Sequence, residues 1–154
     1  DAPNDFGSGT QNSSIRTRTQ VHKACQFAVP GKPVIQCSND PLLGGDPGLM
    51  NPEDLLISAL SACHMLWYLH LASTRGIVVL SYEDTPIGHG ESAPDGTGRF
   101  VAATLKPVIR LPKGTDIDIA DAIHGDIHKY CFIARSVNFP IRHEAEYQFD
   151  AHSV

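Results

Sequence analysis

The feature that most constrains the fold of this chain is a run of twenty residues, 55–74, that contains no Asp, Glu, Lys or Arg. The run follows helix-start signals, because Asn51 can cap a helix and Pro52 suits its first position. Gly76 is a typical residue just past a helix end. We therefore predict one helix that starts at Asn51 and continues to Arg75, with a length of about 36 Å.

A run of this length can span a membrane or form the central helix of a soluble protein. Six polar side chains interrupt it: Ser58, Ser61, His64, His70, Ser73 and Thr74. Strand-like segments flank the run, and the sequence contains no second run of this kind. We therefore predict an enclosed core helix and no membrane partner. Because one domain can hardly cover such a helix on every side, we expect a second subunit to supply part of the cover.

Length, charge and cysteine content exclude several classes of protein. The 154 residues fit one domain, and we predict a flexible arm over 1–14, unlike a signal peptide, and a single domain over 15–154. A formal net charge of −5 argues against nucleic-acid binding, which needs clustered Lys and Arg. Four cysteines are too few for a secreted disulfide framework, so we predict a reducing, cytoplasmic compartment.

The remaining periodicities predict strands and one further helix. Strands are expected over 15–29 and 34–38 around the turn "PGKP", then over 77–91, 99–111 and 141–149. Thr115 is expected to cap a second helix over 116–135. The order β-β-α-β-β-α-β predicts an α+β fold dominated by antiparallel hairpins. Pro107 is expected to place its strand at a sheet edge or at a bulge.

Two cysteines lie on helix faces that we expect to be buried. Cys63 belongs to the enclosed helix. Cys131 lies on the apolar stripe of the second helix, which comprises Ala120, Ile123, Ile127, Cys131 and Ala134. Free cysteine is among the most buried residue types, so both cysteines can be small hydrophobic residues of the core. Alternatively they form a redox pair, in which one thiolate is oxidised to a sulfenic acid and the other thiol condenses with it to a disulfide.

A reactive thiol at position 63 needs a cation to stabilise its charged form. The helix dipole fades within the first turn, whereas Cys63 lies about three turns from the helix start. Glu53 precedes Cys63 by about 15 Å along the helix. If Glu53 contributes, it therefore acts by holding an arginine from elsewhere.

The ordered motifs resemble those of a known family. "NPEDLLISALSACHMLWYLHLASTRG" at 51–76 is followed by a second predicted helix with "HKYCFIARSV" at 128–137 and by a closing strand. Over about residues 20–150 this set resembles the OsmC/Ohr family of osmotically inducible and organic hydroperoxide resistance proteins. The most specific part is Asn-Pro-Glu, then Ala-Cys ten residues after the Glu, then the distant cysteine.

The resemblance implies an OsmC-like α+β fold, with antiparallel sheets wrapped around two central helices of an intertwined homodimer. It implies that Cys63 is the peroxidatic cysteine, that Cys131 is the resolving cysteine, and that Glu53 orients an arginine beside the thiolate. The implied activity is reduction of organic hydroperoxides in oxidative stress defence, with re-reduction by a dithiol, often of the lipoyl type. The resemblance implies no metal, haem or flavin cofactor.

Departures from the family pattern leave a second function open. Well-studied hydroperoxidase members carry an activating arginine before the helix, whereas Arg16 and Arg18 are the only arginines upstream of it here. Cys131 is followed by Phe-Ile-Ala instead of the Pro-Val-Ser type common in those members. The alternative is a non-catalytic OsmC-like protein that binds a ligand or acts in the stress response.

A zinc site is one competing interpretation of the second cysteine. His124, His128 and Cys131 recur at i, i+4 and i+7, and Cys63 or His64 would complete a tetrahedron. Helical histidine pairs are more often solvated or satisfied by hydrogen bonds, and we therefore expect no metal.

Other residues near the motifs also have two interpretations. Cys25 and Cys37 flank "PGKP" nearly symmetrically and can be cross-strand neighbours, either as strand residues or as a disulfide. Apolar residues beside Cys63 line a pocket for apolar hydroperoxides or belong to the plain core; these are Met65, Leu66 and Trp67. We expect His70 and His143 to be core histidines.

Overall fold

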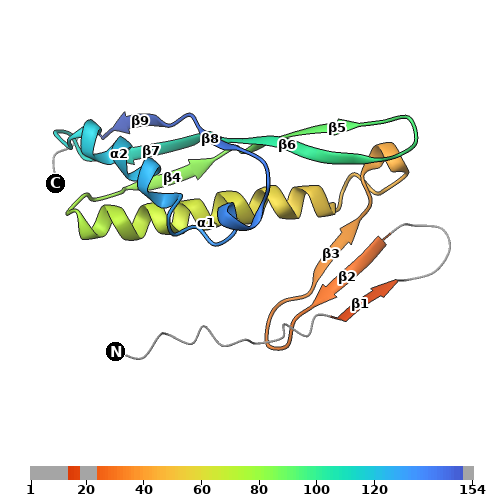
Figure 1. Cartoon of the computed structure of the whole chain (residues 1–154). Coiled ribbons are helices and arrows are strands. Elements are labelled where there is room, and N and C mark those ends of the chain that lie inside the picture. Colours follow the sequence, from red (N-terminus) through yellow and green to blue (C-terminus); the bar gives the residue numbers. More distant parts are fainter. Residues whose placement is uncertain (1–13, 18–23, 151–154) are drawn as a thin grey trace, which may run out of the picture. The chain divides into compact units, whose positions relative to one another are not determined.

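The computed structural model describes residues 14–17 and 24–150 (Figure 1). The arm predicted over 1–14 lies outside these residues except for Ser14. The chain divides into two compact units, one up to Leu55 and one from Leu56 onward. The single domain predicted over 15–154 stays a prediction.

The first unit contains a three-stranded antiparallel sheet in the order β1-β2-β3. Its strands are β1 (Ser14–Thr17), β2 (Ala24–Ala28) and β3 (Ile35–Ser38). β2 and β3 form a hairpin around "PGKP", as predicted, and Cys25 lies directly opposite Cys37. A short 3-10 helix, η1 (Pro41–Leu43), follows β3.

Helix α1 (Pro52–Thr74) has the predicted start and end signals. At its start, the Asn51 side-chain oxygen accepts from the Asp54 N–H at 2.7 Å, and the Asp54 carboxylate accepts from the Asn51 N–H at 3.1 Å. At its end, Gly76 adopts a φ of +71°, and the Ile77 N–H bonds to the Ala72 carbonyl at 2.9 Å. This is the Schellman arrangement that ends many helices at glycine.

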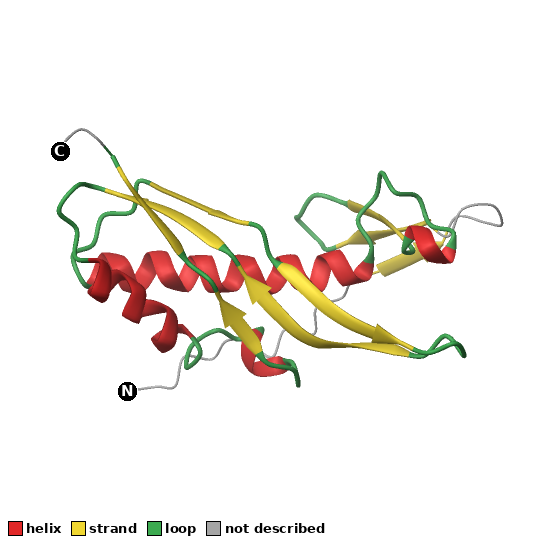
Figure 2. Ribbon diagram, turned by 90° about the horizontal axis from the view of Figure 1, so that it is seen from above, coloured by secondary structure: helices red, strands yellow, loops and turns green. Residues whose placement is uncertain are grey.

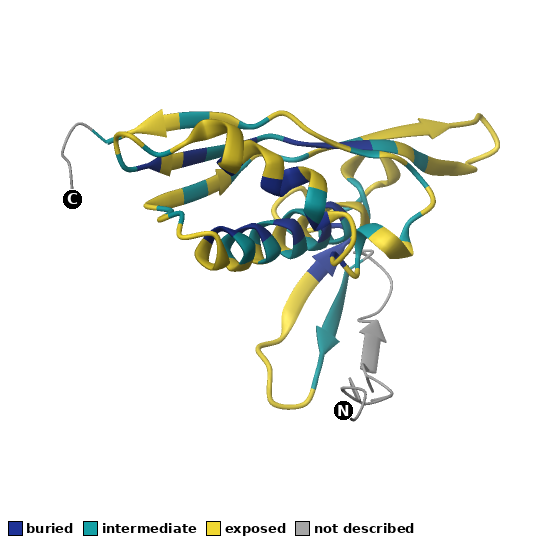
Figure 3. Ribbon diagram, turned by 60° about the vertical axis from the view of Figure 1, so that its left-hand side comes forward, coloured by how far each residue is buried: buried dark blue, intermediate teal, exposed yellow. Residues whose placement is uncertain are grey.

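One stripe of α1 is buried and other positions are exposed (Figure 3). The buried residues recur at spacings of three and four: Ile57, Leu60, His64, Tyr68 and Ala72. Leu66, by contrast, is 62% exposed. α1 is long and apolar enough to cross a membrane, but a single helix of this kind is weak evidence because core helices of soluble proteins meet the same criteria.

Two three-stranded sheets lie against α1 in the second unit (Figure 2), in the orders β4-β7-β9 and β5-β6-β8. Their strands are β4 (Ser81–Asp84), β5 (Ile87–Ser92), β6 (Gly98–Leu105), β7 (Pro107–Leu111), β8 (Ile141–His143) and β9 (Glu146–Phe149). Each strand predicted over 77–91, 99–111 and 141–149 is thus broken into two, with one half in each sheet. β4 and β5 pair in antiparallel fashion with β7 and β6, whereas β8 and β9 pair in parallel.

Pro107 begins β7, which is the central strand of its sheet. The expected edge or bulge position is therefore wrong. A proline is tolerated at the first residue of a strand, where its missing N–H ends the ladder and does not interrupt it. Here it separates β6 from β7 and lets the chain pass from one sheet to the other.

Asp84 links the chain between β6 and β7 to α1 by two hydrogen bonds. One carboxylate oxygen accepts from the Lys106 N–H at 2.7 Å, and the other accepts from the Ser61 hydroxyl at 2.5 Å. Asp84→Ala removes both acceptors, so we expect a loss of about 2 kcal/mol in the free energy of unfolding, measured by urea denaturation. Glu83→Ala removes the adjacent exposed carboxylate and should change it by less than about 0.5 kcal/mol. Equal stabilities for the two variants would contradict this role.

Helix α2 (Ile117–Ile127) is shorter than the helix predicted over 116–135. Its cap is Asp116, whose carboxylate accepts from two N–H groups of the first turn, and not Thr115. The Tyr130 N–H bonds to the Ile127 carbonyl at 2.8 Å, a tighter i→i−3 bond that ends the regular helix. Turns then lead to the 3-10 helix η2 (Ala134–Ser136).

Cys131 stays on the buried stripe although it lies beyond α2. Its N–H bonds to the Ile127 carbonyl at 2.9 Å, and its own carbonyl accepts from the Arg135 N–H at 3.1 Å, both at helical i→i−4 spacing. Cys131 joins the main core of the second unit, which also buries Tyr68, Ala72, Ile109, Leu111, Ala120, Ile123 and Ile127. The burial of the predicted stripe is therefore confirmed for its members up to Cys131.

Candidate functional site

α1 and the segment after α2 bring two thiols together. Cys63 is partly buried on α1 and packs against the apolar core that contains Cys131. Cys131 is 1% exposed, and the neighbouring Cys63 side chain raises its pKa. The structure thus brings the two thiols into one mostly apolar core, and a redox pair needs such neighbours.

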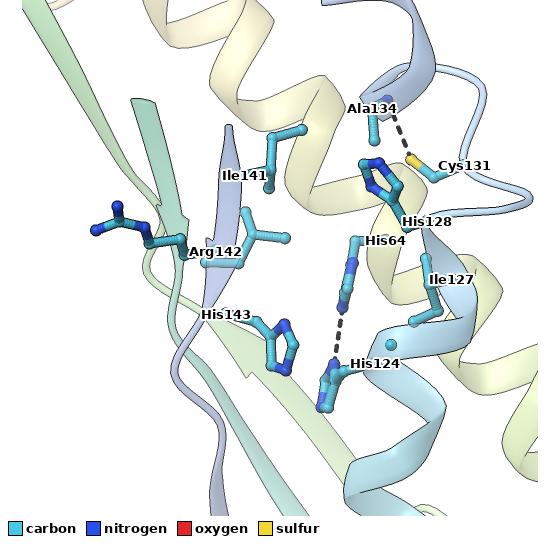
Figure 4. A pocket seen from close by; sticks show the side chains of 11 residues that line it. His64, His124, Ile127, His128, Cys131, Ala134, Ile141, Arg142 and His143 are labelled. Atoms are coloured by element: carbon cyan, nitrogen blue, oxygen red, sulfur yellow. Dashed lines mark hydrogen bonds between the residues drawn. The ribbon is translucent and has the colours of Figure 1, made fainter. Parts of the chain in front are cut away.

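The surroundings of Cys131 determine its protonation. Burial first, and then the neighbouring Cys63 side chain, raise the pKa of Cys131 to about 11. The Ala134 N–H donates to the Cys131 sulfur at 3.4 Å (Figure 4) and acts on the pKa in the opposite direction. At neutral pH Cys131 is therefore a protonated thiol.

Glu53 lies in the first turn of α1, and its side chain is exposed. It forms no ion pair with any side chain that the structure describes. Arg16 belongs to β1, and Arg18 lies outside the described residues. The arginine that the family pattern expects beside the thiolate therefore stays a prediction.

A cleft of about 150 Å³ borders Cys131 and is lined by side chains from α1, α2 and β8 (Figure 4). Four histidines line it, and three of their imidazoles, those of His64, His124 and His143, stack on one another. His64 Nε2 lies 2.8 Å from His124 Nδ1, and the ring centroids of His124 and His143 are 4.7 Å apart. Arg142 also lines the cleft, and its side chain points away from these rings (Figure 4).

Burial keeps the two inner imidazoles neutral. It lowers the pKa of His64 to about 4 and that of His124 to about 3, and the neighbouring imidazoles lower both pKa values further in the same direction. His124 Nε2 is buried without a hydrogen-bond partner in the part of the chain that the structure describes. His64 and His124 are therefore neutral donors and acceptors, and neither serves as the cation that stabilises a thiolate.

The alternative zinc site at His124, His128 and Cys131 is not formed by the described residues. Among the described residues, no group of three or more His, Cys, Asp or Glu side chains could hold a metal ion. His124 Nδ1 is engaged with His64, and His128 is exposed.

Apolar side chains near the two thiols form an exposed surface. Leu66, Trp67 and His70 line a shallow hollow of about 190 Å³. The Trp67 ring stacks on Tyr130 with centroids 5.0 Å apart, and Phe132 is 77% exposed. His70 and His143 are both exposed, so their prediction as core histidines is wrong.

Residues 44–146 match the family model of the OsmC-like proteins. The chain belongs to this family. No curated protein matches this OsmC-like chain. Among solved structures, an OsmC-like protein of unknown function from Vibrio cholerae is 25% identical, with a TM-score of 0.74 over 86% of this chain and 97% of that chain.

Two further structures share the OsmC fold at lower identity. An organic hydroperoxide resistance protein from Legionella pneumophila is 17% identical, with a TM-score of 0.64 over 88% of this chain and 96% of that chain. The organic hydroperoxide resistance protein OhrB of Bacillus subtilis is also 17% identical, with a TM-score of 0.61 over 88% and 97% of the two chains. The predicted α+β, OsmC-like fold is thereby confirmed.

The histidine cluster is the part of this OsmC-like chain that the sequence did not reveal. His64 lies one turn after Leu60 and one turn before Tyr68, on the buried stripe of α1. That stripe cannot be recognised from the sequence because the helix is apolar on nearly every side. If the buried stripe of α1 were recognisable, the sequence would predict contact between His64 and the face of α2 that carries His124.

Proposed function

We propose that this OsmC-like protein is a thiol-dependent peroxidase that reduces organic hydroperoxides, with Cys63 as the attacking thiol and Cys131 as the resolving thiol. The observation that carries the proposal is the packing of Cys63 against the apolar core that contains Cys131, close enough for Cys63 to raise the pKa of Cys131. The hydroperoxide resistance proteins that share the fold support the same chemistry by analogy.

The reaction proceeds in three steps that conserve atoms and electrons. The Cys63 thiolate attacks the distal oxygen of ROOH, the O–O bond breaks, and the alkoxide takes a proton and leaves as ROH. Cys63 is then a sulfenic acid, and the Cys131 sulfur displaces its oxygen as water and forms a disulfide. An external dithiol, such as one of the lipoyl type, reduces this disulfide and is itself oxidised to a disulfide.

The protonation of Cys131 supports this division of roles. A thiol whose pKa is about 11 is a poor initial nucleophile at neutral pH, so the partly exposed Cys63 is the thiol that meets the oxidant. We place Glu53 as a positioning residue, which holds an arginine toward Cys63 from the first turn of α1. No cofactor takes part.

The rate of disulfide formation should follow the thiolate fraction of Cys131. Because its pKa is about 11, this fraction rises roughly tenfold per pH unit between pH 7 and 9. We expect the lifetime of the Cys63 sulfenic acid to shorten accordingly after rapid mixing with one equivalent of hydroperoxide. The fluorescence of Trp67, the single tryptophan of the chain, reports the step. A rate independent of pH would contradict proton loss from Cys131 as the control of this step.

A homodimer belongs to the same proposal. Leu66 and Phe132 expose apolar surface near the thiols, and a second copy would cover it. Phe132→Asp should convert a dimer to a monomer in light scattering after size exclusion, because it would bury a charge in the interface. Leu42→Asp adds the same charge at another exposed apolar position and should leave the dimer intact. A wild-type monomer would refute the dimer.

We also propose a cytoplasmic location, because free thiols persist in a reducing compartment.

The test of the proposed activity is a steady-state assay with cumene hydroperoxide and dihydrolipoamide as the dithiol. We expect dithiol oxidation at a rate that is proportional to the protein concentration and exceeds the rate with hydrogen peroxide. A protein that binds the hydroperoxide or another ligand without consuming either reagent would instead be the non-catalytic OsmC-like protein considered above.

A further inference from the structure

The hairpin of β2 and β3 places a second pair of thiols face to face in the first unit. Cys25 and Cys37 are direct partners in the antiparallel register. The next pair, Gln26 and Gln36, shows that opposed side chains meet across these strands, because Gln36 Nε2 donates to Gln26 Oε1 at 3.2 Å. Directly opposed Cβ atoms lie about 4.5–5.5 Å apart, and a disulfide needs about 3.5–4.5 Å, so a small approach of the strands suffices.

The two thiols differ in access. Cys37 is completely buried, whereas Cys25 is partly exposed. Burial first, and then the charge of Cys25, raise the pKa of Cys37. The influence of Cys25 on Cys37 is a second sign that the side chains lie near each other. A small oxidant in solution can therefore react with Cys25 first, whereas the buried Cys37 reacts only with Cys25.

We propose that Cys25 and Cys37 form a second redox site, which a low-molecular-weight disulfide such as oxidised glutathione converts to an intramolecular disulfide. The Cys25 thiolate attacks one sulfur of RSSR, the S–S bond breaks, and one RSH leaves with the proton that Cys25 has lost. Cys37 then attacks the Cys25 sulfur of the mixed disulfide, and the second RSH leaves with the proton of Cys37. Two protein thiols are oxidised, and one disulfide is reduced to two thiols.

The sheet makes this disulfide reversible. β3 is held on its other side by a parallel bridge between Cys37 and Met50, where the Ser38 N–H bonds to the Met50 carbonyl at 2.9 Å. The backbone around Cys37 is thus held by hydrogen bonds on both sides. The Cys25–Cys37 disulfide therefore has to draw the strands closer than their normal spacing, which strains it. Strained and partly exposed disulfides are the labile, regulatory kind. The site works without Cys63 and Cys131.

The experiment uses the full chain with Cys63→Ser and Cys131→Ser, which leaves only the two hairpin thiols. After incubation with oxidised glutathione, we expect both thiols to disappear and the intact mass to fall by two hydrogen atoms. Chymotryptic cleavage after Phe27 should leave the Cys25 and Cys37 peptides joined until a reductant is added. The native chain, mapped in the same way, should show the same linked peptides.

Two single substitutions in that background test the order of events. Cys37→Ser should stop at glutathione bound to Cys25, and Cys25→Ser should leave Cys37 unmodified until urea exposes it. The proposal is overturned by stable glutathionylation of Cys25 in the chain that retains Cys37, by a disulfide between two chains, or by thiols that remain unreacted.

Discussion

Replacing Cys63 by serine should reduce the dithiol-dependent consumption of cumene hydroperoxide by about 10³-fold or more, because the nucleophile of the first step is lost. The hydroxyl of serine is not ionised at neutral pH and does not form a sulfenic acid. The measurement is the initial rate of dihydrolipoamide oxidation at saturating hydroperoxide. Retained activity would end the assignment of Cys63.

Matched substitutions separate the loss of the nucleophile from a general loss of structure. Cys25→Ser makes the same replacement of sulfur by oxygen in the hairpin and should leave the rate of dihydrolipoamide oxidation unchanged. Cys131→Ser should permit one turnover and then accumulate the Cys63 sulfenic acid, which dimedone labels. Labelling of any other residue would contradict the proposed division of roles.

Acidification from pH 6.5 to 4.5 should cost this protein on the order of 3 kcal/mol in its free energy of unfolding, because two buried histidines resist protonation. The pKa of His64 is lowered to about 4 and that of His124 to about 3, so in this window the unfolded chain binds protons that the folded chain does not. Stability contributed by the neutral imidazoles is thus present above pH 6.5 and is lost as the pH falls toward their folded pKa values. Urea titrations at each pH measure the effect.

His124→Gln should flatten this pH dependence, although the variant is expected to be less stable at pH 7. His128→Gln, a substitution at an exposed histidine of the same segment, should leave the slope unchanged. Asp126, paired with Arg75 and Lys129, also has a lowered pKa, but its contribution is lost only at still lower pH. Equal slopes for the native protein and His124→Gln would show that the histidine cluster is not the source.

The sequence predicted the ends of α1 because local chemistry determines them. Asn51 and Asp54 cap each other, and Gly76 takes the left-handed conformation that its position requires. The buried position of Cys131 was predictable for a similar reason, because an apolar spacing of three and four survives the early end of α2. These features depend on few residues that lie near one another in the chain.

The sheet organisation could not be predicted from the same local signals. Each long predicted strand is continuous in its apolar pattern. The three breaks, before β5, β7 and β9, follow from which sheet each half joins. Asp84 illustrates the difficulty, because it holds Lys106 and Ser61, which are both more than twenty residues away. The histidine cluster likewise depends on contacts between α1, α2 and β8 that no spacing in the sequence encodes.

The proposed function depends above all on the sulfurs of Cys63 and Cys131 acting as one redox pair. The most direct measurement treats the reduced native protein with one equivalent of cumene hydroperoxide, counts the remaining thiols and maps the new linkage by peptide mass. We expect the loss of two thiols per chain and a disulfide between Cys63 and Cys131. A count that stays at four, or a disulfide in which Cys63 is not a partner, would contradict it.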